Sequence, residues 1–189
     1  MEAFLISAGI VGLAEMGDKT QLLSLVLAAR FKRPLPIILG ILVATLVNHG
    51  LAGAVGVWIT ALLGRDALRW VLGLSFLAMA VWILIPDKAD EDESASARFG
   101  VFGTTVIAFF LAEMGDKTQV ATVALAARYP QLAAVVAGTT LGMLLANVPA
   151  VLLGDVVAKK VPMRAVHALA ALLFAVLGVL ALVNVGEVV

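Results

Sequence analysis

A nine-residue segment occurs twice in this chain, as LAEMGDKTQ at residues 13–21 and again, unchanged, at residues 111–119. The separation of 98 residues also aligns other positions: LAAR at 27–30 with 125–128, Gly40 with Gly138, and Phe76 with Phe174. Six of the nine repeated residues are polar or glycine, so a general preference for Leu, Ala and Val does not explain the identity. The repeat predicts two homologous halves, residues 1–86 and 99–189, joined by an acidic segment at 87–98.

The composition indicates a membrane protein. Hydrophobic residues make up 62% of the 189 residues, charged residues make up 14%, and the mean hydropathy is +1.09. A soluble domain is typically about 45–50% apolar and about 25% charged. Because a water-exposed surface cannot hide this much apolar side chain, we predict an integral protein of the lipid bilayer. The net charge of zero provides no field for nucleic acid, and we expect no nucleic-acid partner.

Six predominantly apolar runs are long enough to cross a bilayer as helices, which takes about 20 residues each. They do not alternate apolar and polar residues as barrel strands would. The predicted fold class is therefore all-α, a polytopic membrane protein with six transmembrane helices. The predicted spans are 3–28, 35–62, 68–85, 100–127, 131–153 and 164–184.

An odd number of spans in each half determines the symmetry. With three spans, the second half enters the membrane from the side opposite to the first, so the halves form an inverted-topology repeat. Loops after the first, third and fifth spans hold eight Lys and Arg residues, against three on the other side. By the positive-inside rule, we expect a protein of the cell (inner) membrane with both termini outside and the 87–98 connector in the cytoplasm.

Each repeated motif places three ionisable residues halfway along a predicted span. A charge at the centre of a span costs at least about 2.5–3.5 kcal/mol, and such residues mark ion pathways. On a helical wheel, Asp18 and Lys19 lie three and four residues after Glu15, so they share a polar stripe that Gln21 extends. The glycine in each motif permits local unwinding there, which would free backbone carbonyls as ligands.

The two motifs together offer a site for a divalent cation. Four carboxylates and two lysines sum to −2, which one divalent ion or two protons would neutralise. Oxygen ligands suit Mg²⁺, Ca²⁺ and Mn²⁺, whereas zinc and copper favour imidazoles and thiolates. Competition between protons and a metal for the same oxygens is the simplest antiporter mechanism. The predicted metal ligands are Glu15, Asp18, Glu113 and Asp116, supported by Lys19, Thr20, Gln21, Lys117, Thr118 and Gln119.

Three further polar residues, Asn48, His49 and Asn147, fall within predicted spans. Either they line the site and hold its carboxylates, with His49 as a proton relay, or they form interhelical hydrogen bonds that hold the bundle together. Met16 and Met114 flank the acids, where ordinary packing is the simpler interpretation. Close packing is also the interpretation of five glycines within the spans: Gly50, Gly53, Gly56, Gly138 and Gly142.

The doubled E-x-G-D-K-T motif, on the first helix of each three-helix half, resembles the GDT family of cation/proton exchangers. The resemblance covers nearly the whole chain. It implies that Mn²⁺, or Ca²⁺, is moved out of the cytoplasm against protons, with the four motif acids binding the ion. The manganese preference comes from the resemblance alone. No cofactor is expected beyond the transported cation and the protons, and a homodimer is left open.

Two alternatives stay open from the sequence. A Ca²⁺/H⁺ exchanger of the same fold would use the same oxygens, and only the cation would differ. A membrane assembly or scaffold protein would explain the hydrophobicity but not six charges in mid-span. We do not expect an enzyme, because the sequence shows no nucleophile paired with a base, no metalloprotease motif and no phosphate-binding loop.

Overall fold

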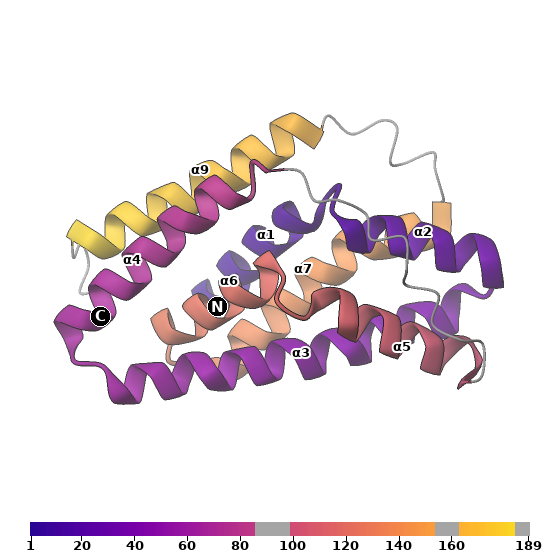
Figure 1. Cartoon of the computed structure of the whole chain (residues 1–189), viewed down its shortest axis with the longest axis horizontal. Helices are drawn as coiled ribbons and strands as arrows, with labels where there is room; N and C mark the ends of the chain where they lie inside the picture. Colours follow the sequence, from indigo (N-terminus) through magenta and orange to yellow (C-terminus); the bar gives the residue numbers. More distant parts are fainter. Residues whose placement is uncertain (86–98, 154–162, 184–189) are drawn as a thin grey trace.

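The computed structural model describes residues 1–85, 99–153 and 163–183, and every regular element within those ranges is a helix. The all-α prediction is therefore confirmed for the described residues, and the predicted connector at 87–98 lies outside them. In chain order the helices are α1 (Glu2–Glu15), α2 (Lys19–Phe31), α3 (Pro34–Leu62), α4 (Arg65–Trp82), α5 (Gly100–Glu113), α6 (Lys117–Arg128), α7 (Leu132–Leu153) and α9 (Met163–Val183) (Figure 1).

The two spans that carry the motif are not continuous helices. Residues 3–28 form α1 and α2, and residues 100–127 form α5 and α6, with a break inside the repeated motif in each case. Gly17 and Gly115 lie in the breaks with φ of 81° and 78°, a left-handed conformation that glycine adopts without a steric cost. The expected helical stripe is therefore wrong, since Asp18 and Asp116 are instead the N-cap residues of α2 and α6.

In the part of the chain that the structure describes, three helices are long and apolar enough to cross a membrane, namely Pro34–Leu62, Leu132–Leu153 and Arg164–Val183. Large apolar side chains are exposed along them, among them Trp58, Leu153 and Leu172. Exposed apolar surface of this extent marks contact with a membrane or another apolar partner. The chain is thus a membrane protein, and the number of six crossings stays a prediction.

The two halves make equivalent contacts with each other. Helix α1 packs along α7, and its counterpart α5 packs along α3, so each first helix lies on the long helix of the other half. Gly40 faces Thr105 and the Phe102 carbonyl, while Gly138 faces Ser7 and the Phe4 carbonyl. Each of these residues is related to its counterpart by the same separation of 98, so the repeat in sequence is also a repeat in packing.

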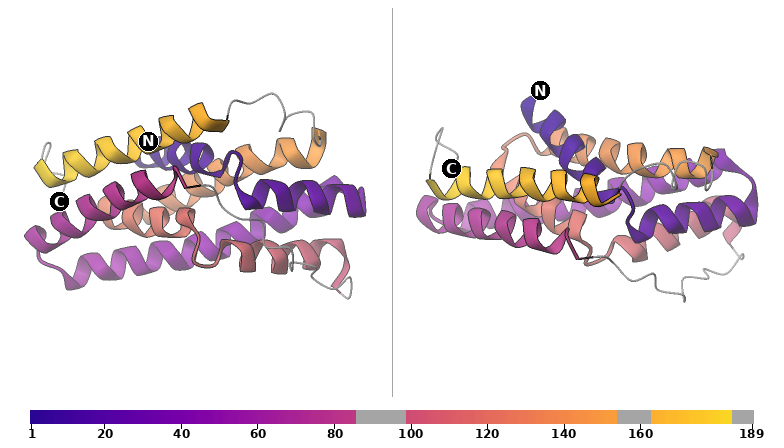
Figure 2. Two further views of the ribbon diagram at one scale, coloured as in Figure 1. Left: turned by 45° about the horizontal axis from the view of Figure 1, so that its top comes forward. Right: turned by 90° about the horizontal axis from the view of Figure 1, so that it is seen from above.

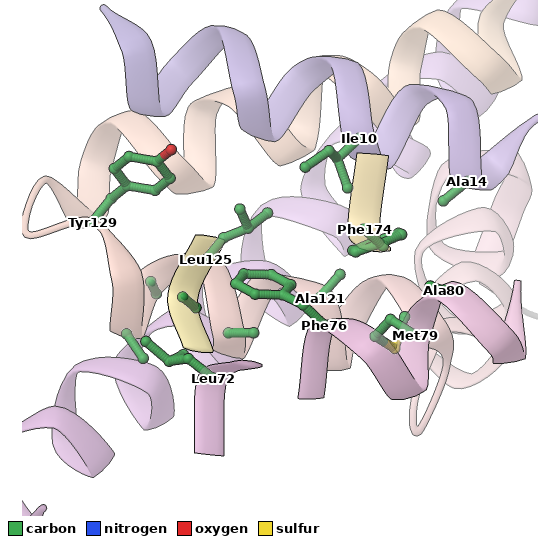
Figure 3. Packing of buried hydrophobic residues seen from close by; sticks show 14 of the residues in the cluster. Ile10, Ala14, Leu72, Phe76, Met79, Ala80, Ala121, Leu125, Tyr129 and Phe174 are labelled. Atoms are coloured by element: carbon green, nitrogen blue, oxygen red, sulfur yellow. The ribbon is translucent and has the colours of Figure 1, made fainter. Parts of the chain in front are cut away.

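Helices α4 and α9 depart from this equivalence. They pack against each other beside α1 and α6, whereas α2 and α5 lie toward the opposite end of the long axis (Figures 1 and 2). The rings of Phe76 and Phe174 have their centroids 6.3 Å apart, within a core that also includes Ile10, Leu72 and Leu125 (Figure 3). Helices α4 and α9, the last described helix of each half, therefore cover the same end of the molecule.

Glycine packing offers a first test of this arrangement. A Cβ at Gly138 would collide with the backbone of Phe4, while one at Gly50 would meet nothing within 4 Å, so the expectation of close packing is wrong for Gly50. We expect Gly138→Ala to destabilise the protein by about 2 kcal/mol through overpacking. Gly50→Ala is the control and should be neutral or stabilising by up to about 1 kcal/mol. Thermal melts in detergent measure both, and equal melting temperatures would contradict the packing described.

Candidate metal centre

The breaks in the two motif-bearing segments bring four acidic side chains into the interior. Glu15 and Glu113 are fully buried, and Asp18 and Asp116 are nearly so. One carboxylate oxygen from each of Glu15, Glu113 and Asp116 lies within 4.8 Å of the other two. Oxygen ligands lie about 2.0–2.6 Å from Mg²⁺ or Ca²⁺, so oxygens on opposite sides of one ion are about 4–5 Å apart. Three of the four predicted ligands therefore lie where one cation could touch them all, and Asp18 is outside this group.

Local hydrogen bonds explain why the glutamates point into the site. Thr20 Oγ1 donates to Glu15 Oε2 at 2.5 Å, and Thr118 Oγ1 donates to Glu113 Oε2 at 2.9 Å. Each threonine thus reaches back across its own break and fixes one oxygen of the preceding glutamate. The second oxygen of Glu15, Oε1, is buried and has no hydrogen-bond partner among the described residues. A buried carboxylate oxygen in this state is a suitable ligand for a cation.

The lysines pair with carboxylates of the opposite half. Lys19 Nζ lies 3.5 Å from Asp116 Oδ1, and Lys117 Nζ lies 3.7 Å from Asp18 Oδ1. The helical-wheel prediction placed Lys19 beside Glu15 in its own motif, and the break in the helix is the reason that it points elsewhere. The two reciprocal ion pairs connect the halves, and the four acids and two lysines still sum to −2.

The two glutamines form hydrogen bonds with the glycines in the breaks and with residues of the long helices α7 and α3. Gln21 Oε1 accepts a hydrogen bond from the Gly17 N–H at 3.1 Å, and its Nε2 donates to the Ala146 carbonyl at 3.0 Å. Gln119 repeats both contacts, accepting from the Gly115 N–H at 2.8 Å and donating to Asn48 Oδ1 at 2.7 Å. Each glutamine therefore joins its own break to the long helix of the other half.

The three further polar residues of the predicted spans, Asn48, His49 and Asn147, lie in different places. Asn48 accepts from Gln119 and so contacts the motif. His49 is fully buried, with Nε2 3.9 Å from Glu113 Oε2, beside the carboxylates. Asn147 accepts from Ser24 Oγ in α2 at 2.8 Å, an interhelical hydrogen bond, and donates within α7 to the Met143 carbonyl at 3.1 Å.

One contact to the motif was missed from the sequence. His167 Nε2 in α9 lies 2.7 Å from the carbonyl oxygen of Met16, inside the first break. A histidine in a predicted apolar span was the available signal, because polar residues in such spans are expensive and tend to be functional. The segment that follows α4 also approaches the site, since Lys117 Nζ donates to the Ile85 carbonyl at 3.2 Å.

Comparison with known proteins gives a consistent result. The family model for the divalent cation/proton antiporter GDT1 matches residues 3–91 and 101–187. A Vibrio cholerae protein named "Putative manganese exporter" is 55% identical over 175 residues, covering 92% of this chain and 87% of its own length. A GDT1-like protein of Synechocystis is 29% identical over 193 residues, covering 92% of this chain and 93% of its own. No solved structure matches.

Proposed function

The chain belongs to the GDT1 family of divalent cation/proton antiporters, and on this basis we propose that it exports a divalent cation, Mn²⁺, from the cytoplasm in exchange for protons. The observation that carries the proposal is the group of three buried carboxylates, drawn from both halves, whose oxygens lie within 4.8 Å of one another. A buried acidic cluster of this kind is costly without a cation or protons to neutralise it.

The ligand chemistry supports a hard divalent ion. All three grouped residues offer carboxylate oxygens, and the chain contains no cysteine to hold a softer metal. The name of the Vibrio cholerae relative favours Mn²⁺. Ca²⁺ is the second candidate, because it takes the same oxygen ligands.

We place the site near the middle of the membrane. In this proposal α1 with α2, and α5 with α6, are two broken spans, which together with α3, α4, α7 and α9 make six crossings. The halves then have opposite orientations, with both termini outside the inner membrane and the 87–98 connector in the cytoplasm. Broken helices that meet at a substrate site are a recurring design of transporters with inverted repeats.

Exchange follows from competition for the same oxygens. When the cation is bound, its two charges offset the local sum of −2. When it leaves, protons on the carboxylates replace it, with His49 beside Glu113 as the proposed relay. Asp116 lies next to both Lys19 and the proposed cation position, so the lysine neutralises this acid in the absence of metal. Access alternates between the two sides of the membrane as the halves move relative to each other.

Proton coupling tests the proposal directly. In proteoliposomes containing the purified protein, an Mn²⁺ gradient should drive proton movement in the opposite direction, reported by an enclosed pH-sensitive dye. Because two protons would replace one divalent ion, we expect the rate to be unchanged when a membrane potential is imposed with valinomycin and K⁺. Liposomes without protein are the control. Mn²⁺ flux that ignores any pH gradient would instead indicate a uniporter or channel.

A further inference from the structure

The contact between His167 and Met16 connects α9 to the first motif. Nε2 of His167 lies 2.7 Å from the Met16 carbonyl oxygen, and a carbonyl oxygen only accepts, so the imidazole donates the hydrogen bond. His167 is half-buried near the start of α9, 151 residues away in the chain. The bond is therefore a tertiary contact between α9 of the second half and the break between α1 and α2 of the first half.

The acceptor lies at a critical point of the break. Met16 is the C-cap residue of α1, with extended backbone at ψ 117°, and Gly17 follows it in the left-handed region. Glu15 ends α1 on one side of this short segment, and Asp18 caps α2 on the other. A backbone carbonyl at the depth of a membrane needs a hydrogen-bond donor, and irregular segments are the places where helices do not supply one.

Within the described ranges, the second motif has no equivalent contact. The separation of 98 residues places Arg69 at the position corresponding to His167, and its guanidinium lies 4.0 Å from Asp66. The counterpart of Met16 is Met114, which is 55% exposed, whereas Met16 is half-buried. The repeated fold therefore does not require this hydrogen bond, because one of the two copies of the motif has its break without it.

We propose that His167 is a positioning residue for the cation site. This role depends on the proposed function. By holding the Met16 carbonyl, His167 fixes the segment between Glu15 and Asp18 and so keeps the Glu15 carboxylate in register with Glu113 and Asp116. It acts through the backbone of the first motif and does not touch the cation.

The test compares His167→Leu with His167→Gln in the full-length protein. Leucine removes the donor, whereas the glutamine amide keeps an N–H at a similar distance along the side chain. We expect the leucine variant to raise the Mn²⁺ concentration at half-maximal transport about fivefold, the factor that corresponds to one hydrogen bond of about 1 kcal/mol. Mn²⁺-dependent thermal stabilisation should show the same loss. The glutamine variant should stay within about twofold of the unsubstituted protein, since the bond is kept. Leu169→Ala, at a position that is 48% exposed on the same helix, is the control and should change neither quantity.

Several results would overturn the role of His167. Equal impairment of the leucine and glutamine variants would show that ring packing matters and the hydrogen bond does not. Unchanged or tighter Mn²⁺ binding by the leucine variant would show that the contact does not position the site. If the unsubstituted protein neither binds nor transports Mn²⁺, the proposed function itself fails, and this role fails with it. If the unsubstituted protein binds Mn²⁺ and the leucine variant binds it equally well, the positioning role of His167 is rejected and the proposed function stands.

Discussion

Glu15→Gln and Glu113→Gln are each expected to abolish Mn²⁺ transport, with a loss of more than about 100-fold, because loss of a residue that merely supports a metal ligand already costs about 10–100-fold. The substitution keeps the shape of the side chain and its hydrogen bond with Thr20 or Thr118 but removes one of three clustered charges. Uptake of Mn²⁺ into proteoliposomes measures the effect. Survival of an Mn²⁺-sensitive deletion strain that expresses each variant provides a second measure.

The structure also ranks the acids, which gives this prediction a sharper form. Asp116→Asn should be as damaging as the glutamate variants, since Asp116 belongs to the group within 4.8 Å. Asp18→Asn should lose about tenfold per folded molecule, the lower end of the range for a residue that supports a metal ligand. Asp66→Asn, at a carboxylate that is 95% exposed, is the matched control and should transport normally. Full activity of Glu15→Gln, or an equal loss in all four acid variants, would contradict the arrangement of ligands.

Lys117→Met is expected to be the most destabilising of the substitutions considered, by about 3–5 kcal/mol, the usual cost of removing one partner of a buried ion pair. Lys117 is 3% exposed and lies 3.7 Å from the buried Asp18. Its removal takes away a positive charge from beside that carboxylate inside the protein. Thermal melts in detergent without metal measure the change.

A double substitution separates the ion pair from simple packing. The variant with both Lys117→Met and Asp18→Asn should recover much of the lost stability, because both charges of the pair are then removed together. Lys19→Met is the matched control in the other pair. The Lys19 side chain is 23% exposed, so water already screens its interaction with Asp116, and the loss should be smaller. Additive losses in the double variant would show that Lys117 and Asp18 do not interact.

The sequence predicts much of the fold because its strongest signals are local. Apolar length predicts α3, α7 and α9 closely, at 34–62, 132–153 and 163–183 against the expected 35–62, 131–153 and 164–184. The exact repeat predicts the equivalence that Gly40 and Gly138 show in their contacts. The motif glycines predict local unwinding, but the sequence does not predict that α1 and α5 end there, because helical periodicity alone continues through a single glycine.

The arrangement of the site is harder to predict from the sequence, because its contacts join residues of the two halves. The motif predicts Glu15, Glu113 and Asp116 as ligands, but spacing along one helix cannot show that Lys19 forms an ion pair with Asp116 of the other half. His167 lies 151 residues from Met16, and no local pattern joins them. The positions of α4 and α9, which pack against each other at one end of the molecule, likewise depend on tertiary packing. The sequence repeat alone does not predict that they lie beside α1 and α6.

The crossed lysine pairs have a consequence for how the chain evolved. Each half carries a lysine that forms an ion pair with a carboxylate of the other half, so neither half forms these ion pairs by itself. The single chain thus resembles a fused twofold dimer in which the same surface is used on both sides. A substitution of a paired residue in one motif therefore also changes the surroundings of its partner in the other motif. This mutual dependence gives a physical reason for the identity of Asp18 and Lys19 with Asp116 and Lys117 in the two motifs.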